Sequence, residues 1–141
     1  MEHRSRTSSD VQPSLFYEDA PAAIAWLARA FGFVERLVVV GPVGTVRHSE
    51  LSLGSVVIFV SSADAGAGRA SPRSLPSLHQ MICVWVEDPD GHYARAKAAG
   101  ATIVQELRDE DYGARGYLAE DPEGHRWYFS DYRPGAHWGA G

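Results

Sequence analysis

The chain has 141 residues, of which 45% are hydrophobic and 22% charged, a composition typical of one soluble globular domain. A second full-sized domain does not fit in this length. The 13 basic and 18 acidic side chains give a formal charge of −5, and no basic run could neutralise a phosphate backbone. We therefore expect no nucleic-acid partner.

The single cysteine and the first residues bear on the cellular compartment. Cys83 cannot form an internal disulfide, which favours a reducing environment. No apolar run approaches the roughly 20 residues that cross a bilayer, and residues 1–10 lack the apolar centre of a signal peptide. We expect a cytoplasmic protein with no membrane partner, in which residues 1–10 form a disordered tail.

One motif occurs twice along the chain. In each copy, a strand-like run leads to an aspartate that can cap a helix, a proline in the first helical turn, and a glycine that closes the helix. The capping residues are Asp19 and Asp88, and the closing glycines are Gly32 and Gly100. The nearly constant spacing between the copies predicts two units of one supersecondary structure.

Helix and strand periodicities agree with this repeat. The first helix has an apolar stripe at the i, i+3, i+4, i+7 spacing, formed by Ile24, Leu27, Ala28 and Phe31. After each helix, alternating polarity predicts three strands. They cover about 33–40, 45–53 and 55–61 in the first half, and about 102–107, 115–119 and 125–131 in the second.

These elements predict an α+β fold of two tandem βαβββ modules, with mixed sheets curved around a groove. Module one covers about 11–62 and module two about 78–134, joined by a linker over 63–77 that is rich in Ala, Gly, Ser and Pro. The two modules form a single domain over 11–134, and residues 135–141 form a C-terminal tail. A sheet covered by a helix on one side leaves its other face free for a ligand or for its twin.

The repeated residues resemble a known family. The opening EDA-x-x-AI-x-WL-x-x-AFGF, the HSEL strand followed by Gly54, and the closing YGARGY and DPEGHRWYF are similar to the vicinal oxygen chelate superfamily over about residues 12–134. That superfamily includes glyoxalase I, extradiol dioxygenases, fosfomycin resistance enzymes and bleomycin resistance proteins, and the small glyoxalase/bleomycin resistance group is the most similar. The scaffold hosts both metal enzymes and metal-free binding proteins, so the resemblance leaves the function open.

The resemblance also implies where a metal ion would lie. In the enzymes of the superfamily, His, Gln or Glu from the first and last strands of both modules hold the ion. The corresponding positions here are Gln12, Ile58 or Phe59, Met81 or Ile82, and Tyr128. Only Gln12 offers a suitable donor, because apolar side chains have no lone pairs for a divalent ion. We expect no metal and no other cofactor, although His79 could rebuild a partial site with Gln12.

Strand alternation, anchored on the resemblance, predicts which side chains line the groove. The expected ligand-binding residues are Phe16, His48, Glu50, Phe59, Met81, Trp85, Arg115, Arg126 and Tyr128. Trp127 and Phe129 should face the helices instead. An aromatic surface with a few polar groups is typical of a small-molecule pocket and favours an aromatic or conjugated ligand.

The His48–Glu50 pair and Trp85 each have a structural interpretation as well as a functional one. His48 and Glu50, two residues apart on one strand face, could act as an acid–base pair or belong to a network with nearby arginines. Trp85 could stack on a ligand or pack in the core.

Arg115 and Cys83 also have two interpretations each. Arg115 lies between two glycines and could present its guanidinium to an anionic ligand, or form a salt bridge with Glu110 or Asp111. Cys83 would be a nucleophile only with a neighbouring base or positive charge, so we expect an inert, small hydrophobic residue.

Two classes of function fit these features. The first is a small-molecule-binding protein that resembles the bleomycin resistance proteins and sequesters a hydrophobic or aromatic compound, such as an antibiotic. The alternative is a glyoxalase-like lyase, isomerase or dioxygenase, with either a degenerate metal centre from Gln12, His79 and Glu50 or metal-free proton transfer by His48 and Glu50. A third possibility is a role in assembly alone. The resemblance also implies a homodimer, and the groove is completed either within one chain or, as in many members of the superfamily, by the second chain.

Overall fold

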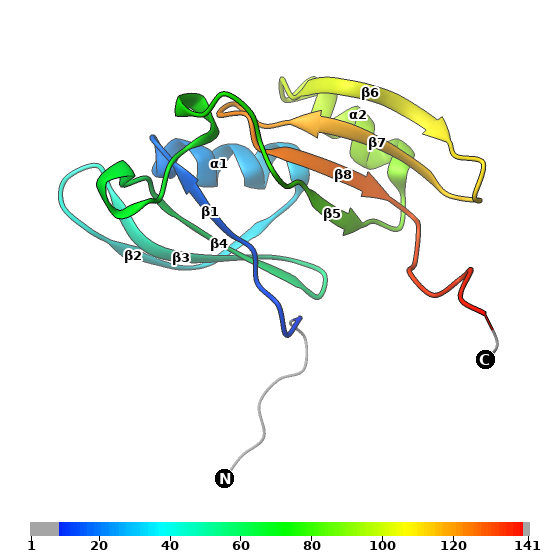
Figure 1. Ribbon diagram of the computed structural model, residues 1–141, viewed down its shortest axis with the longest axis horizontal. Helices are drawn as coiled ribbons and strands as arrows, with labels where there is room; N and C mark the ends of the chain where they lie inside the picture. Colours follow the sequence, from blue (N-terminus) through cyan, green and yellow to red (C-terminus); the bar gives the residue numbers. More distant parts are fainter. Residues whose placement is uncertain (1–8, 140–141) are drawn as a thin grey trace, which may run out of the picture.

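The computed structural model describes residues 9–139 and contains two four-stranded sheets, each with one helix packed on it (Figure 1). The first half contains β1 (Ser14–Tyr17), α1 (Ala20–Phe31), β2 (Val34–Val40), β3 (Val46–Leu53) and β4 (Val56–Ser62). Its strand order is β1-β4-β3-β2, with β1 parallel to β4 and the other pairs antiparallel.

The second half repeats this topology. It contains β5 (Ile82–Trp85), α2 (Pro89–Ala98), β6 (Thr102–Asp109), β7 (Arg115–Glu120) and β8 (Arg126–Ser130), in the order β5-β8-β7-β6 with β5 parallel to β8. Two short 3-10 turns, η1 (Ala65–Ala67) and η2 (Pro72–Ser74), lie between the halves. The predicted α+β fold of two βαβββ modules is therefore confirmed.

The helix ends follow the expected capping. The Asp19 and Asp88 side chains accept hydrogen bonds from main-chain N–H groups three residues later, each at 3.1 Å. Gly32 ends α1 in the left-handed conformation, with φ of 87°. No helix among the described residues is long and apolar enough to span a membrane. Residues 1–8 of the predicted N-terminal tail, and residues 140–141, lie outside the described part.

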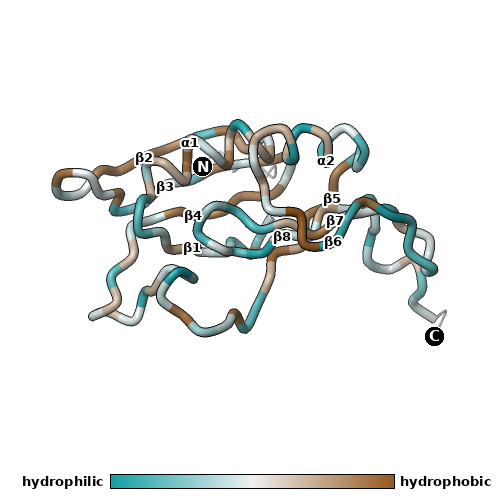
Figure 2. The backbone as a smooth tube through the Cα atoms, turned by 90° about the horizontal axis from the view of Figure 1, so that it is seen from above, coloured by the Kyte–Doolittle hydropathy of each residue, from teal (hydrophilic) through white to brown (hydrophobic). Residues whose placement is uncertain are grey.

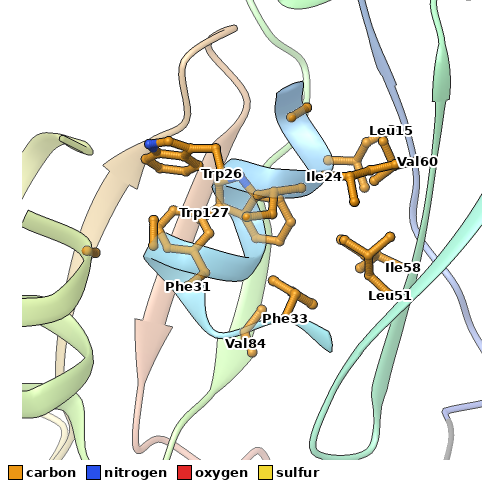
Figure 3. Close-up of a cluster of buried hydrophobic side chains, with 14 of the residues drawn as sticks. Leu15, Ile24, Trp26, Phe31, Phe33, Leu51, Ile58, Val60, Val84 and Trp127 are labelled. Atoms are coloured by element: carbon orange, nitrogen blue, oxygen red, sulfur yellow. The ribbon is translucent and has the colours of Figure 1, made fainter. Parts of the chain in front are cut away.

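One hydrophobic core joins the two halves. Phe31 at the end of α1 lies 4.7 Å from Phe129 and 5.4 Å from Trp127, both on β8, between ring centroids. Figure 3 shows Phe31 and Trp127 next to the buried side chains of the first half. Trp26 on α1 donates its indole N–H to the Ala99 carbonyl at the end of α2 (2.9 Å). Figure 2 shows both helices along the same side of the molecule.

The turn between β7 and β8 connects the two halves through a buried hydrogen-bond network, here called the polar joint. The Asp121 carboxylate is buried and accepts hydrogen bonds from the Tyr17 hydroxyl (2.6 Å) and the Trp127 indole N–H (3.1 Å). Burial and the neighbouring Asp121 charge raise the pKa of Tyr17 well above its ordinary value, so this phenol stays neutral and donates. The joint thus connects β1 of the first half to β8 of the second.

Glu123, in the same turn, binds the start of α1. Its carboxylate accepts the main-chain N–H groups of Glu18 (2.6 Å) and Asp19 (2.8 Å) and the Ser71 hydroxyl (2.6 Å). Burial opposes ionisation of Glu123, but the hydrogen bonds from Ser71 and the two N–H groups outweigh it and lower its pKa. An ionised carboxylate is therefore seated on two adjacent main-chain donors.

Candidate ligand-binding site

Each sheet has an open face, the side opposite its helix. Trp127 and Phe129 are completely buried on the helix side of β8, and Tyr128 between them points to the open face. On β1, Phe16 likewise lies between two buried residues and points the other way. The predicted strand faces are confirmed for these residues, because two large buried side chains fix the alternation.

A cavity of about 1020 Å³, here called the main cavity, lies on the open face of the second sheet. Most of its wall comes from the four strands of the second sheet, the loop after β6 and the segment after β8, with a small contribution from the first half. Its lining residues include Met81, Cys83, Trp85, Gln105, Glu110, Tyr112, Leu118, Tyr128, Tyr132, Arg133, Pro134, His137, Ser9, Ser55 and Val56. Its size and aromatic character fit a drug-sized molecule.

Polar groups gather around Glu110 at the wall of the main cavity. Its carboxylate accepts hydrogen bonds from the Tyr128 hydroxyl (3.1 Å), the Gln105 amide (3.2 Å) and Arg108 Nε (3.2 Å). Burial opposes ionisation of Glu110, but the hydrogen bonds from Arg108 and Tyr128 outweigh it and lower its pKa. Burial, together with the Tyr112 and Glu110 partners, raises the pKa of Tyr128. The cavity therefore presents the Glu110 carboxylate and the neutral Tyr128 phenol.

Trp85 lies at the surface of the cavity. Its side chain is 37% exposed, and the guanidinium carbon of Arg133 lies 3.8 Å from the centroid of its ring. This distance is that of a stacked cation–π contact. Trp85 therefore lies on the open face, where it could stack on a ligand, and does not pack in the core.

The open face of the first sheet carries four other predicted residues, Phe16, His48, Glu50 and Phe59. His48 Nε2 lies 3.0 Å from Glu50 Oε2, and the His48 ring lies edge-on to Phe59 with 4.9 Å between centroids. None of these four lines the main cavity. Within residues 9–139, no arginine forms a salt bridge with Glu50, so the predicted arginine network is not formed.

The expectation that Arg115 points into the groove is wrong. Its side chain lies on the helix side of β7, where it forms a bidentate salt bridge with Asp90 of α2 (2.8 and 3.1 Å) and a third contact with Asp109 (3.1 Å). The predicted partners, Glu110 and Asp111, are therefore also wrong. Arg115 lies on the same face as the buried Tyr117, two residues later, and this alternation places it away from the ligand side.

Arg126 points to the predicted face but lies apart from the main cavity. It forms a salt bridge with Glu120 (2.8 Å) and lines a separate hollow of about 670 Å³ together with His79, Gln80 and Met81. His79 is exposed in the segment before β5. Met81 lines both cavities, and Cys83 is exposed on the floor of the main one.

The residues at the superfamily's metal positions do not fit a divalent ion. Phe59 and Met81 offer no hard donor, and the Tyr128 hydroxyl donates to a carboxylate. Gln12 donates its amide nitrogen to a main-chain carbonyl three residues earlier, at 2.6 Å. Across residues 9–139, no three His, Cys, Asp or Glu side chains come together as a metal cluster. The two isoleucine alternatives add no lone pairs.

Sequence reasoning missed much of the cavity wall, including three of its polar residues, Glu110, Tyr112 and Arg133. Glu110 and Tyr112 lie in the loop after β6, and Arg133 follows the last strand. These segments have no strand or helix periodicity that would predict where their side chains point. The aromatic residues after residue 126 were the available signal, because Tyr128 and Tyr132 both line the cavity.

Comparisons with known proteins agree with this fold. A family model described as "Glyoxalase/Bleomycin resistance protein/Dioxygenase superfamily" matches residues 11–129. The protein Mb0911c of Mycobacterium bovis is 33% identical over 120 residues, which are 83% of this chain and 79% of its own length.

Solved structures show the same similarity. TioX from Micromonospora sp. ML1 is 38% identical with a TM-score of 0.71, over 89% of this chain and 100% of that one. The fosfomycin resistance protein FosX of Listeria monocytogenes, described as complexed with Mn(II) and sulfate, has a TM-score of 0.64 at 17% identity, over 90% and 94% of the two chains. At that identity the likeness concerns the fold alone.

Proposed function

Because the chain belongs to the Glyoxalase/Bleomycin resistance protein/Dioxygenase superfamily, we propose that it is a metal-free protein that binds an aromatic or hydrophobic small molecule. The main cavity carries this proposal. Its wall supplies aromatic rings and aliphatic side chains for contact area, while Glu110 and the tyrosine hydroxyls supply a few groups that orient a ligand. Sequestration of an antibiotic or a metabolite is the biological role that this chemistry supports.

The ionisation of the cavity residues favours binding over catalysis. Burial raises the pKa of the Cys83 thiol, so it is a poor nucleophile at neutral pH. The lowered pKa of Glu110 makes it a weak base, and the raised pKa of Tyr128 makes it a weak acid. General acid–base groups work best when their pKa lies near the operating pH, and none of these three is shifted in that direction.

A metal-free enzyme is the second candidate, and the His48–Glu50 contact of 3.0 Å favours it. The pair lies on the open face of the first sheet, away from the main cavity of the same chain. Proton transfer to a ligand in the main cavity would require a second copy that brings this pair close. The binding function requires no such arrangement, and we therefore prefer it.

A homodimer forms part of the proposal. Both open faces expose large apolar side chains, with Leu37 and Val39 of β2 at 44% and 37% and Met81 beside β5 at 49% exposure. Large apolar side chains exposed on both open faces support an interaction site there. A second copy is the occupant we propose, because the first-sheet residues of one chain could then cover the main cavity of the other.

Tryptophan fluorescence tests the binding function. Trp85 lies in the main cavity, whereas Trp138 is 78% exposed and does not line it. We expect at least one member of a panel of conjugated aromatic compounds to quench the fluorescence of the wild-type protein. Trp85→Leu should reduce both the quenching and the affinity measured by calorimetry by about tenfold, the loss expected when an aromatic stacking partner is removed.

The control is Trp138→Leu, which should bind like the wild type. Treatment with EDTA should leave the affinity unchanged. The proposal is contradicted if no compound in the panel binds, if Trp85→Leu binds as tightly as the control, or if a stoichiometric metal ion is needed for binding.

A further inference from the structure

Trp85 and Arg133 form a wall shared by two cavities. On one side is the main cavity, and on the other is a smaller one of about 450 Å³, here called the corner cavity, between the β3–β4 turn and the start of α2. The corner cavity is lined by the Gly54-Ser55 turn and by Glu87 and Asp88. A ligand that extends from the main cavity past the Trp85 ring therefore reaches the groups that line the corner cavity.

Because the two halves repeat one topology, the first half has a place equivalent to the corner cavity, and a carboxylate fills it. In the first half, the corresponding place is filled by Glu123, whose carboxylate accepts the N–H groups of Glu18 and Asp19. The equivalent residues of the second half are Glu87 and Asp88, and within residues 9–139 their N–H groups have no acceptor. The β3–β4 turn is shorter than the turn that carries Glu123, so it brings no carboxylate to these donors.

An arginine lies beside each of these two places, next to Glu123 in the first half and next to the corner cavity in the second. Arg73 lies 3.8 Å from Glu123 and 3.4 Å from Glu18 in the first half. In the second half, Arg133 lies beside the corner cavity and forms no salt bridge with any residue of the described part. One face of its guanidinium stacks on Trp85, and this leaves the N–H groups at its edge available.

Acidic side chains beside the corner cavity do not prevent a carboxylate from binding there. Asp88 uses its carboxylate to cap α2, since Oδ1 accepts the Gly91 N–H at 3.1 Å. The first half has the same Glu-Asp pair at this position, and it holds the ionised Glu123 next to that pair. In the first half, the hydrogen bonds from the Ser71 hydroxyl and from two main-chain N–H groups, with the nearby Arg73, keep Glu123 ionised despite its burial.

We propose that the ligand is an aromatic carboxylate. Its ring system lies at the end of the main cavity against Trp85, and its carboxylate extends past this ring to Arg133 and to the N–H groups of Glu87 and Asp88. The inference rests on the proposed function, because it names the chemical class bound at the same site. It adds an anion-binding corner that uses main-chain donors and one arginine.

A matched pair of probes tests the proposal. 2-Naphthoate carries the carboxylate, and 2-naphthamide is its neutral counterpart of nearly the same shape. We expect the wild type to bind 2-naphthoate about tenfold more tightly than 2-naphthamide, the effect of charge-assisted hydrogen bonds to an ionised group. Arg133→Gln should weaken binding of 2-naphthoate to the level of the amide and leave binding of the amide unchanged.

Arg69→Gln, in the exposed linker, is the control for loss of one positive charge and should keep the preference for 2-naphthoate. In NMR spectra, 2-naphthoate should shift the amide signals of Glu87 and Asp88 more than 2-naphthamide does. If both probes bind equally, or if Arg133→Gln weakens them equally, the carboxylate inference is wrong and the proposed function stands. If no aromatic probe binds at all, the proposed function fails and the inference fails with it.

Discussion

The two carboxylate oxygens of Asp121 have different partners. Oδ2 accepts the side-chain donors of Tyr17 and Trp127, and Oδ1 accepts three main-chain N–H groups from residues 123–125, each at 3.1 Å. Asp121 is only 3% exposed, so replacing its carboxylate would leave buried donors, above all the Tyr17 hydroxyl and the Trp127 indole N–H, without their partner. One side chain thus shapes the turn and attaches it to the first half.

Asp121→Asn tests this role, because the amide NH₂ replaces an acceptor with a donor on one side. We expect the free energy of unfolding to fall by about 1–3 kcal/mol, the cost of leaving buried donors unpaired, as measured by urea denaturation followed by circular dichroism. Tyr17→Phe removes a single donor and should cost about 1 kcal/mol. Asp111→Asn, on an exposed loop residue, is the control, and equal stability of the two Asn variants would contradict the prediction.

Helix α2 is attached to the rest of the core through His92. Its Nε2 lies 2.9 Å from the Phe31 carbonyl at the end of α1, and its Nδ1 lies 2.6 Å from the Tyr117 hydroxyl on β7. This pattern fits a neutral ring that donates from Nε2 and accepts at Nδ1. Burial lowers the pKa of His92, and Arg95 contributes in the same direction against the opposing effect of the Phe31 hydrogen bond.

The lowered pKa predicts a loss of stability in acid. As pH falls below about 6.5, the ordinary value, the unfolded chain gains a proton on His92 before the folded protein does, so the free energy of unfolding decreases until the folded value is passed. Urea denaturation at pH 7.5 and at pH 5 measures this. His92→Gln should have a smaller pH dependence than the wild type, whereas His137→Gln, on an exposed residue, should keep it. Equal slopes in all three proteins would contradict the prediction.

Strand faces could be predicted from the sequence only where large residues fix the alternation. Trp127 and Phe129 do so for β8, and the position of Tyr128 follows from them. At the start of β7, Arg115 lies between Ala114 and Gly116, and neither small neighbour marks a face. The buried Tyr117, two residues later on β7, does mark the helix side. The prediction failed because it placed Arg115 from the neighbouring glycines and not from this alternation.

The fold was predictable because its signals are local, whereas the cavity wall depends on segments that meet only after folding. Capping aspartates, closing glycines and apolar stripes lie within single elements. Glu110, Tyr112 and Arg133 come from a loop and from the chain after the last strand, and their positions follow from packing on Tyr128 and Trp85. The salt bridges of Arg115 were unpredictable for the same reason.

The whole molecule is expected to be a homodimer in solution, since one chain leaves both open faces uncovered. Size-exclusion chromatography with light scattering should give about twice the mass of the 15.4 kDa chain. Leu37→Glu, on the open face of the first sheet, should shift the equilibrium toward monomer because it places a charge in the proposed interface. Val43→Glu, at a fully exposed turn position, is the control. A wild-type monomer at high concentration would contradict the prediction.

The main cavity is bordered at its rim by Ser9, which precedes the first strand, and by Tyr132, Pro134 and His137, which follow the last one. Segments outside the regular elements tolerate substitution better than the strands do, because few core contacts depend on them. Mutations there can alter which compound is accepted with little effect on folding. Relatives that share these sheets can therefore diverge in the compounds they recognise by exchanging a few residues at the two extremities.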